Sequence, residues 1–402
     1  MPLTPTLIAA IPLAIWIYLF FARGNFWQLR EDKIEPKLLD RWPRVVAIVP
    51  VRNESETIAR SIISLAKQDY SGEFSVLLVD DHSNDGTAEL ARKAAEECGA
   101  TARIAVHSAA ELPPGWTGKV WAMNEGIRAA GDEVPDFFWF TDADIVHAPD
   151  TLRRLVFRAE SNSLDLASLM VLLQAKTIPE RLLIPPFLYF FLMLYPPSWI
   201  ADPKARTAGA AGGCILLRRA ALERIGGMAA IRGEVIDDCA LARIGGMQAI
   251  RNEVIDDCAL ARAVKKSSGK IWMGLTRASV SLRSYGSFGE IRDLIARTAF
   301  TQLRYSFLLL LATLAGLCVT YLLPWVLFFA YPGEAWWFVD TTIALMAASF
   351  GVTVRFYGLP WPWALTLPVA AMFYGYATCV SAVRYWFGRG AQWKGRSQAK
   401  RA

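Results

Sequence analysis

Long apolar runs at both ends of this chain are the feature that most limits how it can fold. The run at 6–21 carries no charged residue, and three further runs cover 307–330, 336–354 and 361–383. A stretch of about 20 apolar residues is long enough to cross a bilayer as a helix. With 54% hydrophobic and only 20% charged residues, the chain is also too apolar for an ordinary soluble protein, so part of it is expected in lipid.

The charges beside these runs predict how the chain is oriented. Four basic residues follow the first run, namely Arg23, Arg30, Lys33 and Lys37. They stand where a cleaved signal peptide would have small residues, so residues 1–30 are expected to be a retained anchor. The positive-inside rule then predicts that the middle of the chain lies in the cytoplasm. Together with the further apolar runs, this predicts a multi-pass protein of the inner cell membrane. Three spans in 307–387 would put the basic tail 388–402 outside, so either one span is a re-entrant hairpin or the tail departs from the rule.

Residues 40–290 alternate between strand and helix patterns, which is typical of a sheet covered by helices. Apolar runs bounded by turn residues predict strands at 45–49, 75–79, 104–107, 137–141, 166–172, 214–217 and 270–273. Helical patterns at 56–67 and 87–98 follow the first two strands. The predicted fold class is therefore α/β, with a parallel or mixed sheet and helices on both faces, plus transmembrane helices at both ends.

Three segments stand apart from this pattern. The apolar stretch 182–199 is broken by prolines, which favours an interfacial or re-entrant segment over a crossing. Residues 224–261 are a tandem duplication that reads RIGGMAAIRGEVIDDCALA and then RIGGMQAIRNEVIDDCALA. Two copies are too few for a solenoid, which needs about three units, so a local duplication inside one domain is expected. Residues 291–306 are expected to form an interfacial helix ahead of the C-terminal spans.

Two carboxylates, Asp142 and Asp144, follow the predicted strand 137–141. A DxD sequence is often only a solvated turn, but at the end of a buried strand it can hold Mg²⁺ or Mn²⁺. Such a metal would neutralise a leaving diphosphate. The chain has three histidines and no CxxC pair, which leaves carboxylates as the expected ligands.

Polar residues after the first two predicted strands indicate a nucleotide site, because ligands of open α/β sheets bind at the carboxyl ends of strands. Asp80 and Asp81 can accept hydrogen bonds from a base or a ribose, and Arg52, Asn53 and Glu54 line the neighbouring loop. The alternative is that these acidic residues only cap the next helix. No GxGxxG sequence follows the first strand, so a Rossmann dinucleotide site is not expected.

Further polar groups fit a phosphate or an acceptor. Lys119 can pair with a phosphate and Asn124 can orient its loop, although a lysine at a helix start can also be simply exposed. Arg304, just ahead of a predicted span, can contact a diphosphate, while Gln302 and Tyr305 can floor an acceptor channel. The alternative for these three is a basic, aromatic helix end at the membrane interface.

Each copy of the duplication carries an aspartate pair, Asp237-Asp238 and Asp256-Asp257, at the start of a helical run. Such a carboxylate can cap the helix, or it can act as the general base on an acceptor hydroxyl. Asp257 is preferred over Asp238 because an uninterrupted helix follows it.

The motifs PVRNE, VDDHSNDGT, GK, TDAD, IDD and QLRY, in this order, resemble the family 2 glycosyltransferases, which are inverting enzymes of the GT-A fold. The stretches WTGKVWAMNEG, AGGCILLRRAAL, VIDDCALA and RTAFTQLRYS are similar to hopanoid-biosynthesis-associated membrane glycosyltransferases. The resemblance implies nucleotide-sugar contacts at Pro50, Arg52, Asn53, Glu54, Asp80, Asp81, Lys119, Asn124 and Asp142. It implies metal ligands at Asp142 and Asp144, a base among Asp238, Asp256 and Asp257, and acceptor or diphosphate contacts at Gly212, Gly213, Gln302, Arg304 and Tyr305. Tyr305 stands where tryptophan is usual, and the IDD segment is doubled.

The sequence therefore predicts an inverting glycosyltransferase that uses a UDP- or GDP-linked sugar and a membrane lipid acceptor, which the resemblance implies to belong to hopanoid biosynthesis. A polyprenyl-phosphate or other glycolipid or polysaccharide synthase is the alternative within this class. An inactive membrane scaffold, suggested by the doubled segment, is the alternative of another class. The net charge of +6 favours an anionic lipid surface over nucleic acid as a partner.

Overall fold

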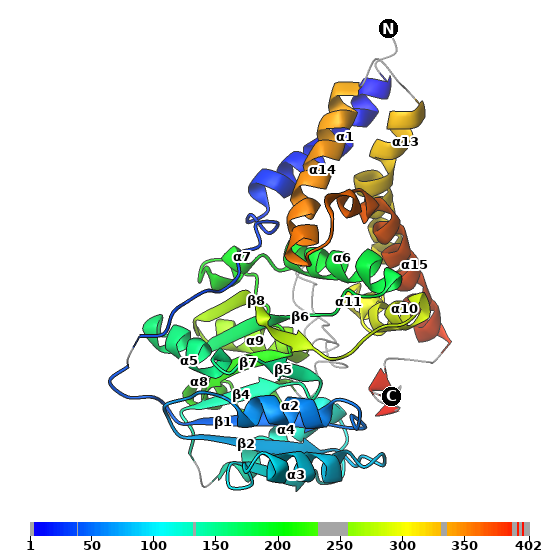
Figure 1. Cartoon of the computed structure of the whole chain (residues 1–402). Helices are drawn as coiled ribbons and strands as arrows, with labels where there is room; N and C mark the ends of the chain where they lie inside the picture. The colour runs from blue at the N-terminus through cyan, green and yellow to red at the C-terminus, as the bar shows by residue number, and fades with distance from the viewer. Residues whose placement is uncertain are drawn as a thin grey trace.

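The computed structural model describes residues 4–37, 39–131, 134–231, 256–330, 336–387, 392–393 and 396–397. An α/β part lies below a group of apolar helices that extends upward to the N-terminus (Figure 1). Asp237, Asp238 and most of the duplication 224–261 lie outside the described residues, as does most of the tail 388–402. Asp256 is described only as the first residue of a helix, without its side chain.

An eight-stranded mixed sheet is the centre of the α/β part, in the order β3-β2-β1-β4-β7-β6-β8-β5. The strands are β1 (Val45–Val51), β2 (Phe74–Asp80), β3 (Ile104–Ser108), β4 (Phe137–Thr141), β5 (Ile145–His147), β6 (Leu166–Leu172), β7 (Cys214–Arg218) and β8 (Ile271–Ser281). Strands β1 to β4 run parallel, whereas β7 is antiparallel to its neighbours β4 and β6. The predicted α/β class with a mixed sheet is confirmed, and β5 is a strand that the sequence pattern did not predict.

Helices cover both faces of the sheet, and the two faces have separate cores. One face packs against α2 (Ile58–Ala66), α3 (Thr87–Glu97) and α5 (Thr151–Ser161), and the other against α4 (Gly118–Ala129) and α9 (Asp256–Lys266). Along β1, Val45, Ala47 and Val49 belong to the first core, whereas Val46 and Ile48 belong to the second. Because both faces are covered, this strand is apolar throughout instead of alternating. Further short elements are α8 (Arg219–Arg224) and the 3₁₀ turn Met228–Ile231 after β7, and β9 (Gln392–Trp393) with β10 (Arg396–Ser397).

The apolar runs form helices. They are α1 (Thr4–Ile17) with the turn Tyr18–Ala22, α12 (Phe307–Leu317) and α13 (Leu323–Ala330) joined through Cys318–Leu322, α14 (Trp336–Phe356), and the turn Trp361–Thr366 with α15 (Leu367–Trp386). Within the described residues, four stretches are long and apolar enough to cross a membrane: Ile178–Ala201, Phe307–Ala330, Trp336–Phe356 and Trp361–Trp386. The N-terminal helix Thr6–Ala22 is shorter. Crossing by the N-terminal helix and by the three C-terminal stretches stays a prediction, and so does the interfacial or re-entrant placement of 182–199.

Helix α6 (Ile178–Leu194), which α7 (Pro197–Ala201) follows, joins the two parts of the molecule. It lies between the sheet and the lower end of α14, and beside the middle of α15 (Figure 1). A capping box of Thr177 and Glu180 starts the helix. Tyr189 then forms a hydrogen bond of 2.8 Å with Ser349 of α14, and it belongs to the same core as Ile48 of β1. The apolar helices and the sheet therefore share one continuous core.

The sequence predicts one interfacial helix over 291–306, and the structure has two shorter ones. They are α10 (Phe288–Ala296) and α11 (Ala299–Gln302). The break falls at Thr298, whose backbone dihedral angles, φ −124° and ψ −14°, are not helical.

Candidate active site

The turn that carries Asp142 and Asp144 connects β4 to β5 and is fixed at both ends by one buried histidine. His147 Nε2 lies 2.8 Å from Thr141 Oγ1, and His147 Nδ1 lies 2.8 Å from Ser279 Oγ on β8. Because Thr141 donates its only hydroxyl hydrogen to the Gly213 carbonyl at 3.0 Å, the ring donates from Nε2 and accepts at Nδ1. Burial lowers the pKa of His147 to about 3, so the ring is neutral at physiological pH. This arrangement holds the DxD turn against β7 and β8.

Each carboxylate of the DxD turn has a basic neighbour. Lys119 Nζ, on the first turn of α4, lies 2.8 Å from Asp142 Oδ1. Asp144 accepts a hydrogen bond of 3.1 Å from Ser281 Oγ and lies 3.6 Å from Arg283 Nε. Burial raises the pKa of Asp144 and the charge of Asp142 adds to this effect, whereas Arg283 lowers it. The two carboxylates are therefore near enough to repel each other, which favours a cation between them.

A pocket beside the turn brings together three stretches that are distant in the sequence. It is lined by Lys119, Met123, Phe140, Thr141, Asp142, Gly212, Ile215, Asp257 and Leu260. A Cβ atom on Gly212 would lie 3.0 Å from Asp257 Oδ2 and 3.3 Å from Lys119 Nζ. Glycine at this position therefore lets the candidate base and the candidate phosphate-binding lysine approach each other across the backbone. Gly213 is equally close-packed, because its Cβ would lie 3.0 Å from Val171 Cγ2.

The predicted nucleotide loops after β1 and β2 are joined by hydrogen bonds. Asn53, in the left-handed region with φ 51°, donates its backbone N–H to Ser83 Oγ at 2.9 Å, and its side chain accepts from the Asn84 N–H at 3.0 Å. Asp80 accepts from the Ser83 N–H at 3.2 Å. These contacts bring the two loops to one edge of the sheet, next to the buried strand residue Pro50.

Asp81, one of the two aspartates predicted to contact the nucleotide base or ribose, is deeply buried. The Asp81 side chain has no exposed surface and lies 3.5 Å from Arg52 Nη1. The carboxylate of Asp81 thus stabilises the loop that carries Arg52. Direct contacts of Asp80, Asp81 and Asn124 with a nucleotide stay predictions.

Arg283 belongs to the site, although sequence reasoning did not identify it. It follows β8, and its Nη2 lies 2.7 Å from Glu54 Oε1 in the loop after β1. Through Glu54 and Asp144 it connects the nucleotide loop to the DxD turn. The only signal in the sequence is the arginine in SLRSYG, ten residues after the predicted strand 270–273, which by itself is not specific.

Three predicted residues, Gln302, Arg304 and Tyr305, lie at the end of α11. Tyr305 stacks on Tyr385 of α15 with 4.0 Å between ring centroids, and its hydroxyl accepts from Thr301 Oγ1 at 3.2 Å. Arg304 and Tyr305 both have positive φ angles, 55° and 57°, in the tight connection to α12. Among the described residues that line the pocket at Asp142, none comes from this segment. Their contact with a diphosphate or an acceptor stays a prediction.

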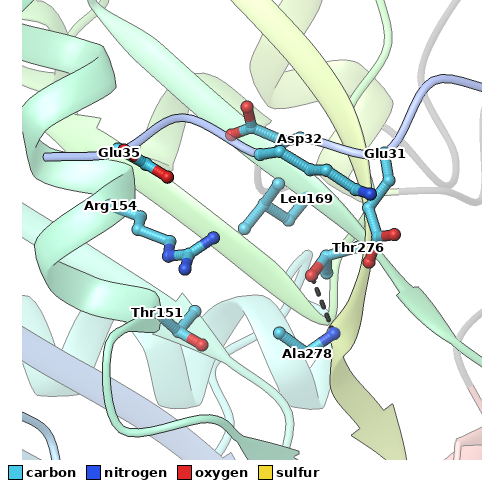
Figure 2. Close-up of a pocket in the computed structure, with 9 residues that line it drawn as sticks. Glu31, Asp32, Glu35, Thr151, Arg154, Leu169, Thr276 and Ala278 are labelled. Carbon is cyan, nitrogen blue, oxygen red and sulfur yellow. Dashed lines mark hydrogen bonds between the residues drawn. The ribbon is translucent and has the colours of Figure 1, made fainter.

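A second pocket lies between the connector that follows α1 and helix α5 (Figure 2). It is lined by Glu31, Asp32, Lys33, Glu35, Thr151, Arg154, Leu169, Thr276 and Ala278. No predicted site residue is in this set. The connector is held there by the Asp32 N–H, which donates to the Leu275 carbonyl at 2.8 Å, and by the ion pair of Asp32 with Arg158. This pocket is therefore separate from the DxD site.

The donor set fits a divalent cation that a substrate helps to hold. Within the described part of the chain, no three His, Cys, Asp or Glu side chains form a metal cluster by themselves. Mg²⁺ commonly binds through one or two carboxylates together with substrate phosphates, and Asp142 and Asp144 offer two. A diphosphate would have to supply further oxygen ligands.

The mixed sheet, with a DxD turn and a basic residue at the ends of its strands, has a GT-A-like fold. Residues 46–226 match the family described as Glycosyl transferase family 2. The mannosyltransferase PcManGT from Pyrobaculum calidifontis has a similar fold, with a TM-score of 0.53 at 18% identity, over 94% of this chain and 99% of that one. Residues 46–226 are less than half of the chain, and over that range the match supports the predicted family 2 glycosyltransferase domain.

Two curated relatives are similar over part of their length. Glucomannan 4-beta-mannosyltransferase 7 of Arabidopsis thaliana is 29% identical over 132 residues, which are 32% of this chain and 23% of that protein. An N-acetylglucosaminyltransferase of Mesorhizobium japonicum is 29% identical over 198 residues, which are 47% of this chain and 42% of that protein. The chain thus spans less than half the length of either relative.

Proposed function

We propose that this chain is an inverting glycosyltransferase that moves a sugar from a nucleotide-sugar donor to a lipid acceptor at a membrane. The observation that carries the proposal is the single pocket that Lys119, Asp142 and Asp257 line together. These side chains provide a group for a phosphate, a ligand for a metal and a candidate base. The names of the relatives, a mannosyltransferase and an N-acetylglucosaminyltransferase, support hexosyl transfer.

The reaction is a single displacement. Asp257 accepts the proton of the acceptor hydroxyl as the acceptor oxygen forms a bond to the anomeric carbon. The bond from that carbon to the diphosphate breaks on the opposite side, so the configuration inverts and no covalent sugar–enzyme intermediate forms. Lys119 pairs with the departing phosphate. Mg²⁺ or Mn²⁺, held by Asp142 and Asp144, would neutralise the charge that develops on the leaving nucleoside diphosphate.

The lipid acceptor is supported by how the two parts of the molecule pack. Three apolar residues line the pocket at Asp142, namely Met123, Phe140 and Leu260. All three belong to the core that also contains Tyr189 of α6 and Phe350 of α14. The apolar wall of the pocket is therefore continuous with the core that packs against the apolar helices. An interfacial α6, with the sheet on the cytoplasmic side, would let a lipid hydroxyl enter from the bilayer. A hopanoid as that lipid rests on the resemblance of the sequence motifs alone.

A polyprenyl phosphate is the alternative acceptor, and an inactive scaffold is the alternative function. A phosphate acceptor is already ionised at neutral pH and needs no base, so the position of Asp257 in the pocket favours a hydroxyl acceptor. The same observation argues against the scaffold, because Asp257, from the second copy of the duplicated segment, is among the residues that line the pocket at Asp142.

The test is transfer from radiolabelled UDP- and GDP-sugars to a membrane lipid extract by the full-length protein in detergent. We expect labelled lipid that disappears with EDTA and returns with Mn²⁺ or Mg²⁺. Mild acid hydrolyses a glycosyl phosphate and leaves a glycoside intact, so this treatment of the product separates the two acceptor classes. Failure of every donor to label lipid, while Asp142→Ala behaves like the natural protein, would support the scaffold.

A further inference from the structure

We propose that Arg283 is a further residue of the donor site, which neutralises Asp144 before the donor arrives and yields this carboxylate to the metal that comes with the nucleoside diphosphate. The inference rests on the proposed function above. It concerns a residue that none of the sequence motifs includes.

The position of Arg283 ties together three strand ends. Glu54 follows β1, Asp144 follows β4, and Arg283 follows β8. The guanidinium Nη2 is 2.7 Å from Glu54 Oε1, while Nε is 3.6 Å from Asp144 Oδ2. Arg283 is further fixed by its backbone N–H, which donates to Ser281 Oγ at 3.2 Å, and the same hydroxyl donates to Asp144.

The two ion pairs of Arg283 are unequal. The contact with Glu54 is a hydrogen bond, but the contact with Asp144 is too long to be one. Arg283 can therefore keep Glu54 and release Asp144. The side chain is a third exposed, so the face turned away from Glu54 can still reach a ligand in the site.

Asp144 is a mostly buried carboxylate, and Arg283 is its basic neighbour, with 3.6 Å between Asp144 Oδ2 and Arg283 Nε. A divalent cation bound to this carboxylate would bring a second positive charge beside the guanidinium, so the cation and Arg283 compete for one carboxylate. Lys119 stands in the same relation to Asp142, at 2.8 Å.

The charge of the site then explains why metal and nucleotide should bind together. Without a ligand, the carboxylates of Glu54, Asp142 and Asp144 are largely balanced by Lys119 and Arg283. A metal ion alone meets a weakly negative site and two repelling bases. A metal ion with a diphosphate brings its own negative charge, which the two released bases can bind.

The experiment is Mn²⁺ binding to the full-length protein in detergent, followed by the EPR signal of free Mn²⁺, with and without UDP or GDP. In the natural protein, we expect one of the two nucleotides to tighten Mn²⁺ binding. Arg283→Met should bind Mn²⁺ alone about fivefold or more tightly, because a competing charge is gone, and should lose most of the gain from the nucleotide. Arg283→Lys, which keeps the charge, should bind Mn²⁺ alone like the natural protein.

A matched control is Arg154→Met in the second pocket. Arg154 forms an ion pair with Asp150 at 2.7 Å, and its side chain is 35% exposed, against 33% for Arg283. This variant removes the same charge and should leave Mn²⁺ binding unchanged.

Equal or weaker Mn²⁺ binding by a folded Arg283→Met would overturn the inference, because a purely structural arginine predicts that result. If this variant does not fold, Arg283→Gln, which keeps a donor toward Glu54, gives the same comparison. Mn²⁺ binding by the natural protein that neither nucleotide tightens also overturns it. If the natural protein binds neither Mn²⁺ nor nucleotide under any condition, the proposed function itself fails.

Discussion

His147 donates a hydrogen bond to Thr141 across the turn that carries the two DxD aspartates, with 2.8 Å between Nε2 and Oγ1. The histidine is fully buried, and no carboxylate is among the hydrogen-bond partners found for its ring in the described structure. The geometry of the turn therefore depends on a neutral imidazole.

This dependence predicts a loss of stability in acid. The pKa of His147 falls from 6.5 to about 3 on folding, so the unfolded chain binds a proton between these values and the folded protein does not. The contribution of the neutral His147 to the free energy of unfolding is complete above about pH 6.5. It declines as the pH falls toward 3, and on the order of 2 kcal/mol is lost at about pH 4.5. Thermal unfolding in detergent at neutral pH and at about pH 4.5 should show a smaller acid-induced drop for His147→Gln than for the natural protein. An equal drop in both would contradict the assignment.

Asp257→Asn tests the base. Transfer to a hydroxyl acceptor should fall by about 10² to 10⁴, while binding of the nucleotide with Mn²⁺ stays close to normal, because Asp257 is proposed to act on the acceptor. The measurements are initial transfer rates and nucleotide affinity.

The control for this prediction is Asp69→Asn, which removes an exposed carboxylate that pairs with Arg153 at 2.9 Å. It should leave the transfer rate unchanged. If Asp257→Asn retains full activity, either Asp257 is not the base or the acceptor is an ionised phosphate, and the chemical class of the labelled product separates these two cases.

Several parts of the fold follow directly from the sequence. The apolar runs VVAIV and FFWFT predict β1 and β4, and the structure buries every residue of both strands. The direction of β7 does not follow, since an apolar run reads the same in both directions. Arg283 could not be predicted either, because its partner Glu54 is 229 residues away in the chain. Lys119 and Asp257 were recognised as separate candidates, but only the structure shows that both flank Gly212.

Gly212→Ala should damage activity much more than stability. The added methyl group would meet the ends of two flexible side chains, Asp257 and Lys119, which can move aside without disturbing the backbone. A displacement of about 1 Å at such groups can cost about 10²-fold in rate. For Gly212→Ala we therefore expect a transfer rate lower by about 10²-fold and a nearly unchanged unfolding temperature.

Gly316→Ala in α12 is the comparison for Gly212→Ala. A Cβ at Gly316 meets no heavy atom within 4 Å, so activity and stability should both be retained. The close approach at Gly212 would be functionally irrelevant if Gly212→Ala were as active as Gly316→Ala.

Glu180 and Glu290 provide a matched pair for the junction between the sheet and the apolar helices. Each is the third residue of its helix and accepts hydrogen bonds around the start of it. Glu180 is fully buried and accepts from the N–H groups of Thr177 at 2.9 Å and Tyr285 at 2.6 Å, and from Ser284 Oγ at 2.8 Å. Its carboxylate thus joins α6 to the loop that carries Arg283.

Glu180→Ala would remove the acceptor that three part-buried donors share, which costs about 3 kcal/mol, whereas Glu290→Ala removes an exposed cap at about 1 kcal/mol. The unfolding temperature in detergent should therefore fall clearly further for Glu180→Ala than for Glu290→Ala. Because Tyr285 lies two residues after Arg283, the same variant should also change the Mn²⁺ affinity, which Glu290→Ala should not. Equal effects of the two substitutions on both measurements would show that the buried carboxylate does not couple α6 to the site.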